Sequence, residues 1–192
     1  ALSLAPALGL AQGGVMNLKP LAFTFTQGKL SGSVRIDARK DIPTSSVDAR
    51  ITDVRAENFI KGSEKPITGI LEARAVLTGT GKSVHAAAAD ANGTFTAVVP
   101  SGGMRHSLAE WTGVDVLSAL SLNLSGDTSN TNLRCAVASF DTKNGVMTSR
   151  QFLIDTDPVR VDGGGTINLG DEVLDMQMQG KPKNFQLMRV RA

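Results

Sequence analysis

The chain has 192 residues, enough to form one domain around a sizeable hydrophobic core. Its 20 Lys and Arg nearly balance its 18 Asp and Glu, which leaves a formal charge of +2 and argues against a nucleic-acid partner. Seven Phe, one Trp and no Tyr offer few aromatic surfaces on which bases could stack, so single-stranded nucleic acid is disfavoured as well.

The first half of the chain predicts short strands joined by turns. Residues 1–18 are rich in Ala, Leu and Gly and fit either a short helix or a frayed tail. From Leu21 onward, apolar and polar residues alternate with the period of two that is typical of a strand with one apolar face. Strands are expected at 21–26, 30–37, 47–52 and 67–78, with a helical turn at 57–61.

The stretch that follows these strands is ambiguous. Residues 83–91 are rich in Ala, which favours a helix, but their position between two strand-like runs favours a strand. We expect a strand here. Asn92 and Gly93 then predict a hairpin turn, with another strand at 94–99.

A change of period predicts one helix at 107–120. Ser107 and Glu110 form a capping box, in which each side chain satisfies a backbone N–H at the start of the helix. Apolar residues recur after it at helical spacing. They are Leu108, Trp111, Val114 or Val116, Leu117 and Leu120.

The last third of the chain is the most regular. Asn144 and Gly145 predict a two-residue hairpin turn, because both residues tolerate a positive φ. Leu174, Met176 and Met178 alternate with polar residues in the final strand. Strands are expected at 133–141, 146–155, 159–162, 166–169 and 173–179, with glycine-rich bends at 163–165 and 170–172.

These patterns predict a mostly β fold: an antiparallel sheet of meandering hairpins with one short helix near 107–120. Residues 1–20 are expected to be a poorly defined N-terminal segment, and residues 21–192 a single β-rich domain. We expect the chain to be a fragment of a longer protein.

No motif in the sequence indicates catalysis, a metal or a cofactor. Residues 79–83 end like a phosphate-binding loop, but Val76 stands where the first glycine of that motif is required. His85 and His106 have no partner at ligand spacing, and Asp155 and Asp157 fit an Asp-Pro turn better than a metal or acid–base site. Cys135 is expected to be a small buried hydrophobe in a strand.

Taken in order, several segments resemble the C-terminal region of the AsmA family. Each matches a strand, turn or short helix of that family, and together they run from about Leu21 to Lys183. The segments are 67–83 (ITGILEARAVLTGTGKS), 111–117 (WTGVDVL), 133–140 (LRCAVASF), 144–145 (NG), 153–156 (LIDT) and 161–169 (VDGGGTINL).

This resemblance implies a non-enzymatic protein of the bacterial envelope. AsmA-like proteins are anchored in the inner membrane by an N-terminal helix, and their β-rich bodies in the periplasm are thought to form long apolar grooves. The resemblance therefore implies that the antiparallel sheet of this chain is bent into a groove or half-pipe. The family is linked to lipid transport and outer-membrane biogenesis. For this chain it implies a phospholipid or other envelope lipid as partner, the rest of the parent chain as neighbour, a membrane anchor outside this sequence, and no cofactor.

An apolar face of the sheet is the candidate lipid-binding surface. Each methylene of an acyl chain that such a face shields from water gains about 0.8 kcal/mol. The alternatives are that the same residues form a closed core under the helix, or that the chain is a structural module that pairs with partners through its edge strands. The candidate lining residues are Leu71, Ala73, Ala75, Leu77, Leu174, Met176 and Met178.

Overall fold

The structure is a computed structural model that describes residues 3–4, 9–24, 27–59, 67–104 and 131–183, with side chains from residue 13 onward. Within these residues the fold is almost entirely β, with one α-helix, α1 (Val84–Ala89), and one 3-10 helix, η1 (Ala56–Phe59). The strands are β1 (Ser3–Leu4), β2 (Gly9–Gln12), β3 (Val15–Thr24), β4 (Lys29–Asp37), β5 (Thr44–Arg55), β6 (Ile67–Thr80), β7 (Asn92–Val99), β8 (Gly102–Met104), β9 (Thr131–Lys143), β10 (Val146–Thr156), β11 (Val159–Asn168) and β12 (Val173–Pro182).

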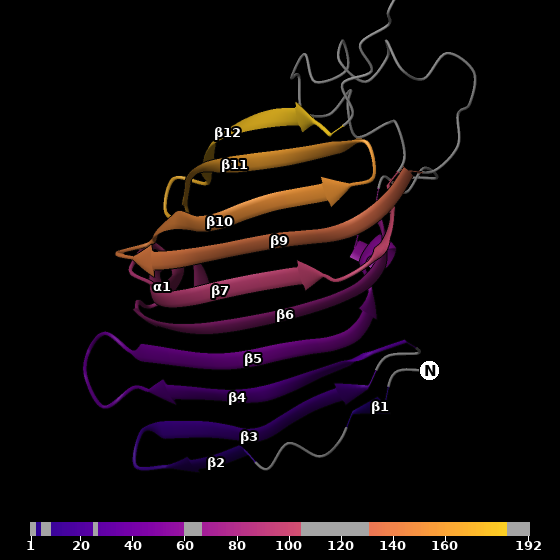
Figure 1. The fold of residues 1–192 in the computed structure, drawn as a ribbon. Coiled ribbons are helices and arrows are strands. Elements are labelled where there is room, and N and C mark those ends of the chain that lie inside the picture. Colours follow the sequence, from indigo (N-terminus) through magenta and orange to yellow (C-terminus); the bar gives the residue numbers. More distant parts are fainter. Residues whose placement is uncertain (1–2, 5–8, 25–26, 60–66, 105–130, 184–192) are drawn as a thin grey trace, which may run out of the picture.

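All twelve strands belong to one antiparallel sheet (Figure 1). From β3 to β12 the strands follow one another in sequence order, and β7 pairs directly with β9. Two short strands lie outside this order: β2 pairs with β3, and β8 pairs with β6 and β9. A meander of antiparallel hairpins is therefore confirmed as the architecture.

The two faces of the sheet differ in polarity, and β6 shows the rule. Along this strand the half-buried residues Leu71, Ala73, Ala75 and Leu77 alternate with exposed residues such as Glu72. Directly opposed residues of antiparallel strands point to the same side, so the strand register carries this division across the sheet. We call the side of Leu77 the trough face and the side of Glu72 the outer face.

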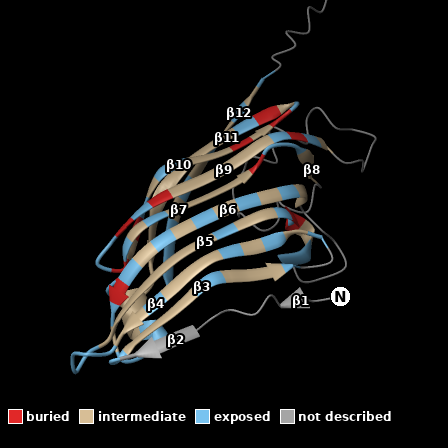
Figure 2. Ribbon diagram, turned by 90° about the horizontal axis from the view of Figure 1, so that it is seen from below, coloured by how far each residue is buried: buried red, intermediate tan, exposed pale blue. Residues whose placement is uncertain are grey.

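The sheet is bent, and both helical elements lie on its trough face. Seen along the stack of strands, the sheet is bowed, and in Figure 1 α1 and η1 lie behind it (Figures 1 and 2). α1 touches the end of β6 at Gly79, the β9–β10 turn at Gly145 and the β11–β12 turn at Gly170. A helix of six residues is only about 9 Å long. Strands that are far apart in the sheet therefore converge on it.

A compact hydrophobic cluster lies at the η1 end of the trough face. Its buried members are Ala56 of η1 with Val99, Leu133 and Ile154, and Leu133 is only 1% exposed. Partly buried residues from the start of β6 and from β11 pack against the same cluster. The cluster therefore holds β6 and β11 around η1.

The strand expected at 83–91 is wrong, because α1 forms there. The hydroxyl of Ser83 caps this helix by accepting a hydrogen bond from the amide of Ala86 at 3.0 Å. Asn92 and Gly93 do not form a hairpin turn either. They begin β7, and the side chain of Asn92 accepts a hydrogen bond from the amide of Asn144 at 3.1 Å.

The bend expected at 163–165 is also wrong, since β11 runs through all three glycines as a single strand. At the N-terminus, residues expected to be helix or tail instead belong to β1, β2 and the start of β3. The turn at Asn144 and Gly145 is confirmed, with φ values of 48° and 73°. η1 confirms a helical turn near 57–61, and the helix expected at 107–120 lies outside the described residues.

Candidate functional site

Four of the predicted lining residues lie together on β6. Leu71, Ala73, Ala75 and Leu77 occupy the trough face and are half-buried. Leu71 also packs against the hydrophobic cluster at η1. One end of this set is therefore core, and the remaining three residues line the middle of the trough.

The other three predicted residues lie on the same face but at the far edge of the sheet. In register, Leu174 stands opposite Ile167, Met176 opposite Gly165 and Met178 opposite Gly163. Leu174 is 66% exposed, whereas the two methionines are half-buried. β7, β9, β10 and β11 lie between them and β6 in the order of the sheet.

A larger part of the trough face comes from residues that the sequence did not single out as lining. They lie on β3, β4 and β5, in register with the apolar positions of β6. The signal was the same alternation of apolar and polar residues that marked β6. They are Met16, Leu18, Leu21, Phe23, Leu30, Val34, Ile36, Val47, Ala49 and Ile51.

Burial divides the trough into two sections. On the trough face of β3 to β6 the apolar side chains are half-buried, except for Val54, which is 4% exposed. On β7, β9 and β10, Val99, Phe140, Met147 and Ile154 are each at most 8% exposed, whereas Phe95 and Phe152 are half-buried. The most buried side chains therefore lie mainly on β7–β10, which we call the filled section, and β3–β6 form the open section of the trough.

The outer face carries its charges in pairs. Arg74 binds Asp48 across neighbouring strands through two hydrogen bonds of 3.2 and 3.0 Å, and this guanidinium lowers the pKa of Asp48. Arg160 binds Asp162, two residues further along the same strand, through hydrogen bonds of 3.0 and 2.9 Å and lowers the pKa of that carboxyl. Such exposed pairs add little stability. They keep this side of the sheet hydrated.

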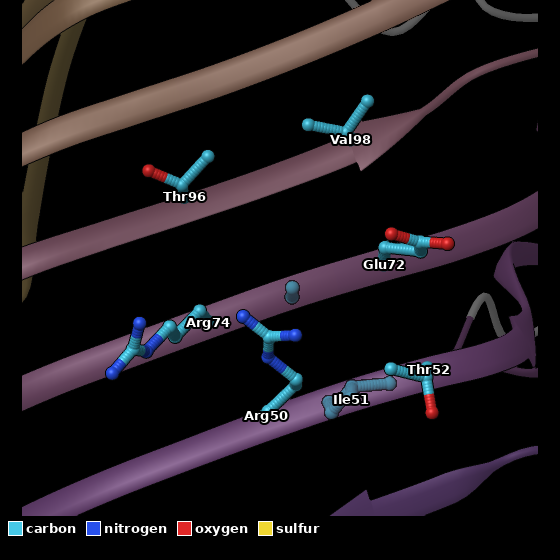
Figure 3. A pocket seen from close by; sticks show the side chains of 8 residues that line it. Arg50, Ile51, Thr52, Glu72, Arg74, Thr96 and Val98 are labelled. Carbon is cyan, nitrogen blue, oxygen red and sulfur yellow. The ribbon is translucent and has the colours of Figure 1, made fainter.

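A shallow depression of about 170 Å³ lies on the outer face over β5, β6 and β7 (Figure 3). The side chains of Arg50, Arg74, Glu72 and Thr96 stand on the near side of the strands. Both guanidinium groups have a carboxylate nearby on the same face, so the charges balance. We assign no ligand to this depression.

One ion pair on the sheet is better shielded than the others. Lys183 forms an ion pair with Asp155 and donates a hydrogen bond to the carbonyl of Thr156 at 2.6 Å. The side chains of Asp155 and Lys183 are 20% and 25% exposed. The pair lowers the pKa of Asp155, against a burial effect that raises it, and Arg134 at 3.7 Å acts in the same direction as Lys183. It fastens the end of β12 to the sheet.

The segment that ends like a phosphate-binding loop has the order strand, loop and helix, but its groups are already engaged. The Ser83 hydroxyl caps α1, and the backbone of Ala86 and Ala87 lies against Gly81. His85 is 60% exposed on its side chain and lies 3.8 Å from Glu172. Among the described residues, no three His, Cys, Asp or Glu side chains gather in a way that could hold a metal ion.

The remaining candidates are structural. Asp157 accepts a hydrogen bond from Asn132 at 2.9 Å, and Thr156 bonds the carbonyl of Val159 at 2.7 Å, which together build the predicted Asp-Pro turn. Cys135 is half-buried on the outer face rather than fully buried as expected, because β9 places it opposite Asp155. In the part of the chain that the structure describes, no helix is long and apolar enough to span a membrane.

Comparison with known proteins identifies the family. The chain is 23% identical over 179 residues to the AsmA family protein YhjG of Escherichia coli (strain K12). The alignment covers 92% of this chain but only 26% of that relative, so the chain spans about a quarter of the relative's length. No solved structure matches the chain. The model of the AsmA family matches residues 10–152, which is most of the chain, and the chain therefore belongs to the AsmA family.

Proposed function

We propose that the trough binds the acyl chains of a phospholipid or another envelope lipid, and that the chain serves lipid transport or outer-membrane biogenesis. Membership in the AsmA family suggests an envelope-associated role. The observation that carries the finer proposal is the open section of the trough. Its apolar side chains form a continuous surface across β3, β4, β5 and β6, on the side of the sheet opposite the charged pairs. They are half-buried, so part of this apolar surface remains in contact with water.

The physical basis of binding is the removal of methylenes from water. A gain of about 0.8 kcal/mol per methylene means that eight shielded methylenes supply about 6 kcal/mol before the costs of ordering the chain. A polar head group can remain in water beyond the rim of the trough. This mode of binding requires a continuous apolar surface and no chemical group at a fixed point.

The remaining parts of the proposal follow from the family. The protein acts without catalysis or cofactor, as a segment of a longer protein whose membrane anchor lies outside this sequence. It works in the periplasm, attached to the bacterial inner membrane. The alternation of an apolar face with a hydrated outer face supports a surface in contact with water on one side and lipid on the other.

Two neighbouring residues of β6 provide a matched test. Leu77 is half-buried on the trough face, whereas Val76 is 39% exposed on the outer face. A Leu77→Glu variant should bind a phospholipid with one fluorescent acyl chain at least about tenfold more weakly, a loss of about 1.4 kcal/mol. Val76→Glu adds the same charge to the same strand and should leave binding unchanged.

The measurement is fluorescence titration of the purified chain, with circular dichroism and thermal unfolding to verify that both variants fold. Equal loss of binding in both folded variants would contradict binding in the trough. Absence of any lipid uptake by the unmodified chain would contradict the proposed function as a whole.

A second candidate function is an interaction module that pairs through an edge strand. β12 is the last strand in the order of the described sheet, and its Val173 and Leu174 are 55% and 66% exposed. An exposed edge of this kind can accept a further strand. Concentration-dependent self-association that Val173→Lys abolishes, together with absent lipid uptake, would favour this function over the first.

A further inference from the structure

We propose that Phe95 and Phe140 form a stop in the trough that sets the length of the acyl chain it accepts. This inference rests on the proposed lipid-binding function and adds a determinant of ligand length to it. The two residues lie on neighbouring strands, β7 and β9, directly opposite each other in register. Their ring centroids are 6.4 Å apart, with the planes tilted by 40°.

The stop stands where a track of small residues ends. One cross-strand row of the trough face runs from Gly32 on β4 through Ala49 on β5 and Ala75 on β6. In the same row, Ala75 is directly opposite Phe95. A chain that lies over the small residues therefore meets the aromatic ring at the next strand.

Larger side chains flank this track. Ile51 lies beside Ala49 on one side, and Val47 lies on the other, both on the trough face of β5. On β6, Leu77 flanks Ala75 on the side of Val47, whereas Ala73 on the side of Ile51 is itself small. A floor of small residues with larger neighbours along one side and on β5 fits a single extended acyl chain that runs across the strands.

Burial changes within the stop, between Phe95 and Phe140. Ala49 and Ala75 are half-buried in the open section, whereas Phe140 is 4% exposed and Met147, further along the trough face, is 8% exposed. Phe152 on β10 adds a third aromatic side chain to the filled section and packs against the hydrophobic cluster. Among the described residues of this row, the side chains are thus half-buried up to and including Phe95, and full burial begins at Phe140 on the next strand.

The spacing of strands converts this geometry into a length. The row is bounded by Leu21 on β3, which lies opposite Gly32, and by Phe95 on β7. These strands are four steps apart in the sheet, or about 19 Å, which corresponds to roughly fifteen methylenes of an extended chain. Affinity should rise with acyl length up to about this value and then level off. Moving the stop by one strand, about 4.8 Å, should move that limit by roughly four carbons.

Two substitutions should move the limit in opposite directions. Phe95→Ala removes the first ring, so the limit should lengthen by roughly four carbons, to the ring of Phe140. Ala75→Phe places a ring one strand earlier and should shorten the limit by a similar amount. Val76→Phe is the matched control, because it adds the same ring to β6 on the outer face, away from the trough.

The experiment measures competition between a fluorescent fatty acid and unlabelled saturated fatty acids of eight to twenty-two carbons for the unmodified chain and the three variants. Opposite shifts for Phe95→Ala and Ala75→Phe, with no shift for Val76→Phe, would support the stop. Binding with the same length limit in all four proteins would overturn it while leaving the proposed function intact. Absence of fatty-acid binding by the unmodified chain would overturn both. Phe95→Leu, which keeps an apolar side chain of smaller size, replaces Phe95→Ala if that variant does not fold.

Discussion

Gly163 lies directly beneath the ring of Phe152: a Cβ added to this glycine would stand 2.7 Å from Cδ1 of the ring. The two residues are paired across β10 and β11, next to the point where the register of these strands shifts. The ring can pack onto the sheet there because Gly163 has no side chain. The run of three glycines therefore serves packing within a strand.

Substituting each of the three glycines by Ala should give a graded loss of stability. A Cβ on Gly165 would meet the carbonyl oxygen of Asp175 at 2.1 Å, and φ is +151°, so this variant should lose about 2–3 kcal/mol or more. At Gly163 the new Cβ would displace the ring of Phe152, which should cost about 1–2 kcal/mol of stability. At Gly164 the nearest atom is the Ser149 hydroxyl at 3.3 Å, and the loss should stay below about 1 kcal/mol. Urea unfolding of the three variants measures this order, and an equal loss at all three positions would contradict it.

Replacing Gly79 should dislodge α1. A Cβ there would lie 1.9 Å from the carbonyl oxygen of Ala87, too close for either backbone to remain in place. We expect Gly79→Ala to speed the hydrogen exchange of the α1 amides relative to the unmodified chain and to lower stability by about 2 kcal/mol or more. Ser83→Ala is the control: it removes the N-cap alone and should cost about 1 kcal/mol. Similar exchange in both variants would show that Gly79 does not seat the helix.

Stability should fall at acid pH through Asp155. Its pKa in the folded protein lies below the ordinary value of 3.8, chiefly because of its ion pair with Lys183. The folded state therefore binds this proton less readily than the unfolded state. The contribution of the pair is fully present above the ordinary carboxyl pKa and is lost as the pH falls through the lower pKa of the folded state.

Asp155→Asn should thus destabilise the protein at pH 7 and reduce the loss of stability between neutral and acid pH. Asp48→Asn is the comparison, because the pair of Asp48 with Arg74 is about half exposed and contributes little. Thermal unfolding across this pH range tests both variants. Identical pH profiles for the unmodified chain and Asp155→Asn would refute the assignment.

Glu57 should matter as a hydrogen-bond acceptor at the other rim. Its carboxylate accepts a hydrogen bond from the amide of Gly69 at 3.2 Å and lies 3.4 Å from Arg55. Glu57→Ala leaves that amide without its acceptor and should cost about 1–2 kcal/mol. Glu57→Gln retains an acceptor and should cost less, as measured by urea unfolding. A larger loss for Gln than for Ala would contradict this role.

The sequence predicted the parts of the fold that depend on local patterns. The alternation of Leu71, Ala73, Ala75 and Leu77 placed them on one face, because strand geometry alone decides that relation. Ser83 and the alanines after it favour a helix, and a helix forms there. The strand-like segments on either side of them in the sequence favoured a strand instead, which led to the wrong prediction. The decisive contacts of that helix, with glycines on three other segments, are tertiary.

Other features needed the register between strands. Gly163 looked like a bend because glycine disfavours strands, and nothing local reveals that Phe152 lies above it. The stop at Phe95 depends on its pairing with Ala75 and Phe140, and those three residues lie on separate strands. The open and filled sections of the trough could not be told apart for the same reason, since burial depends on what the sheet folds around.

The contacts of α1 have a consequence for the width of the trough. The alanines of α1 lie against glycines, so the helix is about as narrow as a helix can be. It acts as a spacer between the ends of β6 and β11. The diameter of the spacer fixes how far those strand ends can approach one another. Bulkier side chains on α1 would push those strand ends apart. The width of the trough at this rim therefore depends largely on the methyl groups of the alanines and on the glycines that face them.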